Sequence, residues 1–248
     1  MNALILAAGL GTRLNPLTDT MPKALVPVNG KPLLQLIVEK LKNFGFNNIV
    51  INVHHFSQQI IDFIESNDRF GVNIKISDES KKLLDTGGAI KKAMNLFDNP
   101  TPLLVHNVDI LHNINLKEIY DQYAYKSDAT LIVSQRKTTR YLLADFQGLV
   151  KGWTNINTGE IKSPLECVMS HPEEYMRVAF SGIHILSHNL LLQMSSWDDH
   201  FSIIDFYLDS CNKHNISVVN LPNMQLLDVG KLDTITEAER FLMDINGQ

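Results

Sequence analysis

The residues best suited to chemistry lie near the start of the chain, between Ala3 and Val28. Gly9 and Gly11 follow a short apolar run there, and two cations, Arg13 and Lys23, come after them. Glycine lets the backbone approach an anion with its N–H groups pointing inward, and arginine adds a planar cation that can bind in a bidentate manner. Two fixed cations beside a glycine turn suit the binding of a nucleoside triphosphate.

A carboxylate lies where it would face this turn. The apolar run Pro102 to Asp109 reads as a buried strand that ends on an aspartate. An aspartate at the carboxyl end of a strand, opposite a triphosphate loop, is well placed to hold Mg²⁺ between protein and phosphate oxygens. The segment ending at Asp228 repeats this pattern, because an apolar run again ends on an aspartate before a glycine.

Alternating strand and helix patterns must position these residues. Apolar runs at 4–6, 48–53 and 72–76 predict strands, and periodic apolar residues after Pro32 and Ser57 predict helices between them. This order predicts an α/β fold, a Rossmann-like α/β/α domain with a mostly parallel central sheet. Ligands are expected at the carboxyl ends of its strands.

The second half of the chain has a different pattern. Residues 140–187 contain strand-like segments with turns and no clear helix, which predicts an antiparallel β insertion that meets the second substrate. Helices are predicted at 116–125, at 202–213 and at about 233–243. Within the insertion, the small pair Ser181-Gly182 interrupts a bulky strand, which suits either a ligand close to the backbone or a bulge.

Several strings in a fixed order suggest a known family. They are AAGLGTR with Lys23, DTGGA, the strand to Asp109, FSGI and DVG, and together they resemble the signature of the sugar-1-phosphate nucleotidylyltransferases. The chain lacks the GK[ST] ending of a P-loop kinase and the third glycine of a dinucleotide fingerprint. The resemblance implies a GT-A-like fold, Mg²⁺ as cofactor, and transfer of a nucleotidyl group from UTP or GTP to a sugar 1-phosphate.

The resemblance also implies a role for individual positions. Arg13 and Lys23 are expected to be catalytic, and Asp109 and Asp228 to hold the metal. The expected nucleotide contacts are Ala7, Ala8, Gly9, Gly11, Thr12, Gly87, Gly88 and Asn107, and the expected sugar-phosphate contacts are Asp145, Glu166, Ser181 and Gly182.

Three features can be interpreted either as structural or as functional. Gly87 and Gly88 would also serve as a simple turn that starts a helix, and Glu79 and Asp85 nearby would meet the base or remain solvated. The basic cluster Arg136, Lys137 and Arg140 would either cover a sugar phosphate or form a solvated turn. The adjacent histidines at 54–55 favour a structural role over a zinc site, because neighbouring side chains on a strand point to opposite faces.

Composition limits the class of protein. The 248 residues are expected to form one domain, with 1–135 as the nucleotide-binding half, 136–230 as the sugar-phosphate half and 231–248 as a C-terminal helix. A formal net charge of -5 shows no basic surplus for nucleic-acid binding. Two cysteines are too few for a disulfide framework, and no apolar stretch is long enough to cross a bilayer. A cytoplasmic protein without nucleic-acid or membrane partners is therefore expected, with its oligomeric state open.

The sequence leaves two classes of function open. Within the family, the chain looks most similar to the short bacterial enzymes that use UTP and N-acetylmuramic acid 1-phosphate. Mannose- or heptose-1-phosphate guanylyltransferases come next, and a choline-phosphate cytidylyltransferase is more distant. The other class is a catalytically silent sensor of a nucleotide sugar, which Val108 motivates because similar enzymes have glycine there.

Overall fold

Strand β1 (Asn2–Leu6) lies inside a mixed sheet, and its neighbours bring several strand ends to one edge. In the computed structural model, which describes residues 1–246, β1 pairs in parallel with β4 (Asn48–Val53) and β6 (Leu103–Asn107). Strand β5 (Asn73–Asp78) extends this parallel part beyond β4. Ligands bind at the carboxyl ends of such strands, and the glycine turn begins at that end of β1.

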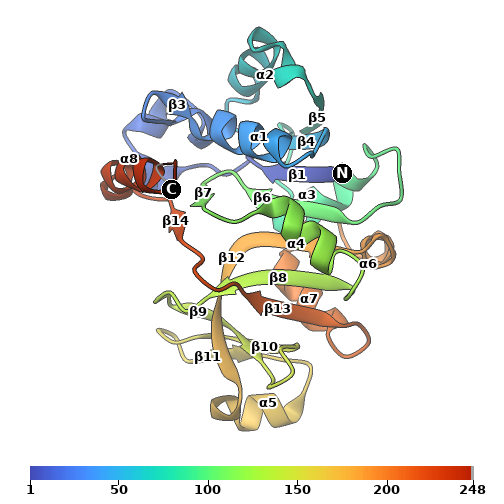
Figure 1. The fold of residues 1–248 in the computed structure, drawn as a ribbon. Helices are drawn as coiled ribbons and strands as arrows, with labels where there is room; N and C mark the ends of the chain where they lie inside the picture. The colour runs from blue at the N-terminus through green and yellow to red at the C-terminus, as the bar shows by residue number, and fades with distance from the viewer. Residues whose placement is uncertain (247–248) are drawn as a thin grey trace.

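The second half of the chain adds antiparallel strands to the same sheet (Figure 1). Strand β12 (Met176–Leu186) pairs antiparallel with β6, β8 and β9, β13 pairs in parallel with β8, and β10 and β11 continue from β9. Their bounds are Ala129–Ser134 for β8, Arg140–Ala144 for β9, Val150–Asn155 for β10, Glu160–Lys162 for β11 and Ile216–Asn220 for β13. The predicted α/β fold is confirmed, with a sheet that is mixed and partly parallel.

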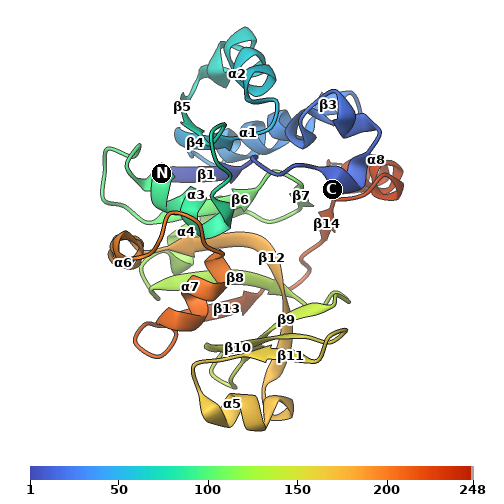
Figure 2. The ribbon, with the colours of Figure 1, turned by 180° about the vertical axis from the view of Figure 1, so that it is seen from behind.

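Helices cover both faces of the sheet (Figures 1 and 2). Residues Ala3 and Ile5 of β1 pack into one apolar core, and Leu4 packs into the other, as expected for a strand covered on both sides. The first core includes residues of α1 (Leu33–Asn43), α2 (Ser57–Ser66), α4 (Leu116–Tyr123) and α8 (Asp233–Asn246). The second includes residues of α3 (Asp85–Met94), α6 (His188–Gln193) and α7 (Ile203–Ser210).

Short elements complete the fold. The region 140–187, which was predicted to lack a helix, contains α5 (Glu166–Ser170) and the 3-10 segment η5 (Pro172–Glu174). That prediction was wrong because five residues are too few to show helical periodicity. The other short elements are β2 (Pro27–Val28), β3 (Lys31–Pro32), β7 (Ile110–His112), β14 (Leu226–Asp228), η1 (Thr12–Leu14), η2 (Leu17–Asp19), η3 (Lys23–Leu25), η4 (Asp68–Gly71) and η6 (Met194–Ser196).

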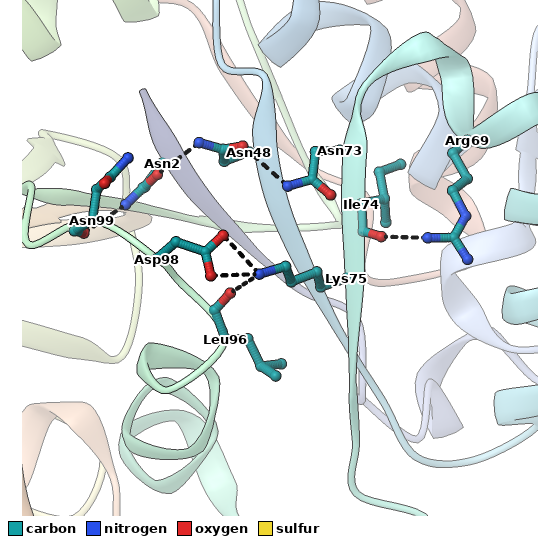
Figure 3. Close-up of polar contacts among 9 residues, drawn as sticks. All are labelled: Asn2, Asn48, Arg69, Asn73, Ile74, Lys75, Leu96, Asp98 and Asn99. Atoms are coloured by element: carbon teal, nitrogen blue, oxygen red, sulfur yellow. Dashed lines mark hydrogen bonds and ion pairs between the residues drawn. The ribbon is translucent and has the colours of Figure 1, made fainter.

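A row of asparagine side chains crosses the amino ends of β1, β4 and β5 (Figure 3). Asn48 Nδ2 donates to Asn2 Oδ1 over 3.4 Å, and Asn73 Nδ2 donates to Asn48 Oδ1 over 3.2 Å. Asn2 Nδ2 donates in turn to the carbonyl oxygen of Asn99 over 3.3 Å. A shift of one residue in the pairing of any of these strands would break this row and turn every side chain of that strand to the opposite face of the sheet. The row therefore helps to fix the register that keeps the opposite, carboxyl ends of these strands together.

Strand β12 bends at Gly182, which has φ +83°. The pairing of β12 with β8 shifts register between Phe180 and His184, so the small residues mark an irregularity of the strand. Before the bend β12 pairs with β9, and after it β12 pairs with β6. Glycine tolerates this left-handed backbone at no steric cost. The bend lets one strand join the antiparallel part of the sheet to the parallel part.

The chain ends in α8, which packs Ala238 and Leu242 into the first core. The helix begins at Asp233 as predicted and continues past the predicted end. The last two residues of the predicted segment 231–248 lie outside the described residues. Within residues 1–246, no helix combines the length and apolar character needed to cross a membrane.

The buried histidine of β12 makes the stability of the fold depend on pH. His184 is fully buried, its Nδ1 is hydrogen-bonded with the Tyr207 hydroxyl over 2.5 Å, and burial lowers its pKa to about 3. Since the pKa is about 6.5 in the unfolded chain, protonation favours unfolding, so the stability present above pH 6.5 is lost as the pH falls toward 3.

We expect this one group to cost about 2 kcal/mol of unfolding free energy between pH 6.5 and 5. Urea unfolding at several pH values measures the slope. His184→Gln, which keeps a partner for Tyr207, should flatten it, whereas His200→Gln at an exposed position should not. Equal slopes for wild type and His184→Gln would contradict this interpretation.

Candidate active site

The glycine turn after β1 leaves open space on one side and is tightly packed on the other. The N–H of Ala7 donates to Asn52 Oδ1 over 2.6 Å, which ties the start of the turn to the end of β4. A Cβ on Gly9 would meet nothing within 4 Å, so this backbone is open to a ligand. Gly11 has φ +68°, and a Cβ there would lie 2.9 Å from Thr18 Cγ2. The second glycine is thus required by the fold, and the first leaves room for an anion.

The ammonium of Lys23 lies at this turn. Lys23 is the first residue of η3, and its Cβ is 3.0 Å from the point where a Cβ on Gly11 would lie. Its Nζ forms an ion pair and hydrogen bond with Asp109 Oδ2. Lys23 is only 8% exposed, and it borders the same cavity as Ala7, Ala8 and Gly9. The structure therefore brings the predicted cation, the turn and the first predicted metal ligand together.

The second predicted ligand, Asp228, lies beside Asp109. Asp109 follows β6 and precedes β7, and β7 pairs antiparallel with β14 so that Ile110 is opposite Asp228. The N–H of Val229 donates to the carbonyl oxygen of Asp109 over 2.8 Å. Two aspartates far apart in the sequence are thus held side by side, Asp109 in the turn before β7 and Asp228 at the end of β14.

The environment of Asp228 fits a divalent cation. Its Oδ1 is buried and has no hydrogen-bond partner within residues 1–246. Burial raises the pKa of Asp228, and the neighbouring Asp109 adds to this effect, while Lys23, Arg136 and Arg13 oppose it. A buried carboxylate oxygen without a donor, beside a second carboxylate, matches the oxygen ligands of Mg²⁺. No group of three or more His, Cys, Asp or Glu side chains converges within 1–246. Mg²⁺ in such sites also takes phosphate oxygens and waters as ligands.

A cavity of about 230 Å³ lies between the glycine turn and α3. Its lining includes predicted nucleotide contacts and both ends of the Lys23–Asp109 pair, together with Asn52 and Glu79. Asn52 Nδ2 donates to Glu79 Oε1 over 2.8 Å, and the N–H of Leu84 donates to Glu79 Oε2 over 3.1 Å. Asn52 was not among the predicted site residues, although an asparagine buried in the apolar strand β4 was a signal for one.

The predicted nucleotide contacts divide into two groups. Ala7, Ala8, Gly9 and Asn107 line this cavity. Thr12 lies outside its lining, in η1. The structure gives Gly87 and Gly88 another setting, since their N–H groups donate to the carbonyl oxygen of Phe201 and their α-carbons pack against neighbouring atoms of Asp199 and Phe201. A Cβ on Gly88 would lie 2.0 Å from the Asp199 carbonyl oxygen. The glycine pair is therefore explained by packing, and Asp85, Thr86 and Ala89 of α3 reach the cavity instead.

The predicted sugar-phosphate contacts also divide. A Cβ on Gly182 would lie 2.5 Å from Asn107 Nδ2, so the bend of β12 brings Gly182 against a residue that lines the first cavity. Ser181 is buried, and its hydroxyl oxygen accepts from the N–H of Ile183 over 3.1 Å. Asp145 instead closes the turn between β9 and β10, where its Oδ1 accepts from the N–H groups of Gln147 and Leu149. Glu166 is exposed at the start of α5, and neither of these acids lines a cavity that Asp109 or Asp228 borders.

Two buried histidines brace the turn that carries Asp109. The N–H of Ile114 donates to His112 Nδ1 over 3.0 Å, so His112 must carry its proton on Nε2. That Nε2–H donates to His106 Nε2 over 2.9 Å, and His106 Nδ1–H donates to the carbonyl oxygen of Asn107 over 2.7 Å. Burial lowers the pKa of His106 to about 4. Both rings are thus neutral at pH 7, and they link β6 to the residues after β7.

A second cavity, of about 790 Å³, borders Asp228, whereas the first cavity borders Asp109. Arg13 lines it, and a Cβ on Gly230 would lie 2.9 Å from Arg13 Nη2. The remaining lining residues come from the loop before β9 and the first residue of β9, and from the turn before α8 and the start of α8. They are Arg136, Thr138, Thr139, Arg140, Lys231, Asp233 and Thr234. The adjacent carboxylates of Asp109 and Asp228 therefore lie between the two cavities. Lys137 does not line the second cavity.

Comparison with known proteins decides the family. A model of the family described as Nucleotidyl transferase matches residues 2–245. The chain belongs to this family. The nucleotidyl transferase assignment confirms the predicted family and enzyme class, since the match spans both cavities and both aspartates.

Individual members resemble the chain over shorter stretches. It is 45% identical over 115 residues to N-acetylmuramate alpha-1-phosphate uridylyltransferase of Neisseria meningitidis, which covers 46% of this chain and 49% of that protein. It is 38% identical over 120 residues to D-glycero-alpha-D-manno-heptose 1-phosphate guanylyltransferase of Campylobacter jejuni, covering 48% and 52%. The chain thus spans about half the length of these curated relatives. The crystal structure of HddC from Yersinia pseudotuberculosis complexed with GMP-PN shares the fold, with a TM-score of 0.75, 23% identity and coverage of 97% and 99%.

Asp228→Asn tests the electrostatics of the carboxylate pair. Without metal we expect it to raise the melting temperature by roughly 2 °C or more, because a charge disfavoured by burial and by Asp109 is removed. Adding Mg²⁺ and a nucleoside triphosphate should raise the melting temperature of wild type and not that of Asp228→Asn. The exposed Asp209→Asn is the control. A lower melting temperature for Asp228→Asn in EDTA would speak against a strained carboxylate.

Proposed function

We propose that this protein is a Mg²⁺-dependent sugar-1-phosphate nucleotidylyltransferase. It would condense a nucleoside triphosphate with a sugar 1-phosphate to give a nucleoside diphosphate sugar and pyrophosphate. The observation that carries the proposal is the placement of Asp109 and Asp228 side by side between two cavities, with Lys23 at the glycine turn. The same arrangement suits a phosphoryl centre with one substrate on each side.

The reaction needs no nucleophile from the protein. The phosphate oxygen of the sugar 1-phosphate is already anionic at neutral pH, so it attacks the α-phosphorus directly while the bond to pyrophosphate breaks. The barrier is charge repulsion and alignment, which fixed cations reduce. Mg²⁺, when bound by Asp109 and Asp228, supplies Lewis-acid stabilisation of the phosphate oxygens. Lys23 would steady the α-phosphate and the incoming phosphate.

Other residues of the chain would orient the substrates. Gly9 leaves its side of the turn open for the triphosphate, and Arg13, beside Asp228 and Gly230, would neutralise the departing pyrophosphate. Glu79 and Asn52 would contact the nucleoside, since they are a hydrogen-bonded polar pair in the wall of the first cavity. Val108 lines the first cavity and does not close it. Its N–H donates to the carbonyl oxygen of Leu6 over 3.1 Å.

The best-supported substrates are UTP and N-acetylmuramic acid 1-phosphate. The support is the 45% identity to the Neisseria meningitidis uridylyltransferase, whose name states the sugar and the nucleotide. The 38% identity to the Campylobacter jejuni guanylyltransferase supports the second candidate, GTP with a heptose or mannose 1-phosphate. A catalytically silent nucleotide-sugar sensor is a third candidate, but retention of both carboxylates and both cations favours an enzyme over it.

A substrate panel separates these candidates. The protein is incubated with Mg²⁺, each of UTP, GTP and CTP, and each of several sugar 1-phosphates. We expect pyrophosphate release to be fastest with UTP and N-acetylmuramic acid 1-phosphate. Faster release with GTP would replace this pair by the guanylyltransferase alternative, and no release with any pair, despite measurable nucleotide-sugar binding, would indicate the sensor.

Lys23→Ala and Asp109→Ala test the central groups. Each should reduce turnover about 10²–10³-fold, the loss typical of removing one preorganised charge-stabilising group. Lys31→Ala removes the same charge from an exposed ion pair with Glu39 and should retain the wild-type rate. Circular dichroism checks that each variant folds. A folded Lys23→Ala protein with near-normal pyrophosphate release would refute the assignment.

A further inference from the structure

The second cavity is lined by more cationic side chains than carboxylates. Its lining carries four cationic side chains and two carboxylates, and the cations are Arg13, Arg136, Arg140 and Lys231. Across the described chain, residues 1–246, no acidic side chain forms an ion pair with any of these four. Such a set of uncompensated cations attracts an anion into the cavity.

The four cations of this cavity have different surroundings. Arg13 lies at the carboxylate pair, because a Cβ on Gly230 would lie 2.9 Å from Arg13 Nη2 and 2.7 Å from Asp228 Oδ1. Arg136 Nη2 donates to the carbonyl oxygen of Phe180 over 3.2 Å. Within residues 1–246, Arg140 and Lys231 form hydrogen bonds only through their backbone atoms. Their side chains are therefore available for another negative group.

The segments that carry these two outer cations are held in place. In the loop before β9, the N–H of Thr138 donates to the Tyr141 hydroxyl over 3.0 Å, and the N–H of Ile156 donates to the Thr139 carbonyl oxygen over 2.8 Å. At the start of α8, the Thr234 hydroxyl donates to the carbonyl oxygen of Lys231 over 2.7 Å. Because the backbone that carries the two cations is fixed, only their side chains must be ordered when an anion binds, which lowers the entropic cost of binding.

We propose that Arg140 and Lys231 form a subsite for a carboxylate carried by the sugar of the sugar 1-phosphate. The inference rests on the proposed function and makes it more specific. Arginine pairs with carboxylates in a bidentate geometry, and lysine adds a compact charge. The lactyl ether of N-acetylmuramic acid carries such a carboxylate, whereas mannose and heptose 1-phosphates carry only the phosphate. The charge of the cavity therefore favours the acidic sugar.

A matched pair of substrates tests the subsite. N-acetylmuramic acid 1-phosphate and N-acetylglucosamine 1-phosphate differ only by the lactyl ether, and pyrophosphate release at saturating UTP and Mg²⁺ gives KM for each. We expect wild type to prefer the acid. Arg140→Gln and Lys231→Gln should each raise the KM for the acid about tenfold or more, the loss of a charge-assisted hydrogen bond, and leave that for the neutral sugar within about twofold.

Lys137→Gln is the control, because it removes a charge from the same loop outside the cavity lining. It should change neither KM. An equal rise of both KM values in Arg140→Gln would show a contact to phosphate or pyrophosphate and would overturn the proposal. Wild type without a preference for the acid, or a selective loss in Lys137→Gln, would also overturn it.

Binding measurements separate failure of the subsite from failure of the proposed function. If no sugar 1-phosphate yields pyrophosphate, calorimetry with a non-hydrolysable UTP analogue and Mg²⁺ compares the same two sugars. A preference for the acid that Arg140→Gln abolishes would support the subsite although transfer fails. Equal binding of both sugars to wild type would reject the subsite.

Discussion

The pairing of two three-residue strands, β7 and β14, is the constraint on which the site depends. It places Asp228 opposite Ile110, next to Asp109, and joins the parallel part of the sheet to the start of α8. The pairing is stabilised from both ends, because Ile110 and Val229 are buried and α8 packs into the same core. Short strands alone would contribute little, so the position of the second carboxylate follows from tertiary packing.

This constraint brings like charges together at a cost in folding free energy. Two partly buried carboxylates repel each other. Burial raises the pKa of Asp228, and this repulsion raises it further. Lys23 compensates Asp109, while one oxygen of Asp228 has no donor within the described residues. A bound cation would relieve both effects. The same arrangement that destabilises the free protein would thus strengthen binding of the metal and the triphosphate.

The sequence allowed much of the parallel half to be predicted, because there the local signals coincide with the fold. Apolar strands, helix starts and the turn at Gly9 and Gly11 depend on neighbouring residues, and the structure places them as expected. Gly87 and Gly88, which were predicted to contact the nucleotide, pack against Phe201, a partner remote in the sequence that no local pattern indicates. Asp145 and Glu166 were assigned by resemblance, and their local turn and short helix carry no periodic signal.

The most direct test of the central claim is the affinity for Mn²⁺, used in place of Mg²⁺, measured by electron paramagnetic resonance with UTP present. We expect one ion per wild-type chain. Asp109→Asn and Asp228→Asn should each weaken binding by at least about tenfold, the loss caused by disturbing even an outer-shell partner. Wild-type affinity in either variant would contradict the claim that the two strands hold one shared metal site.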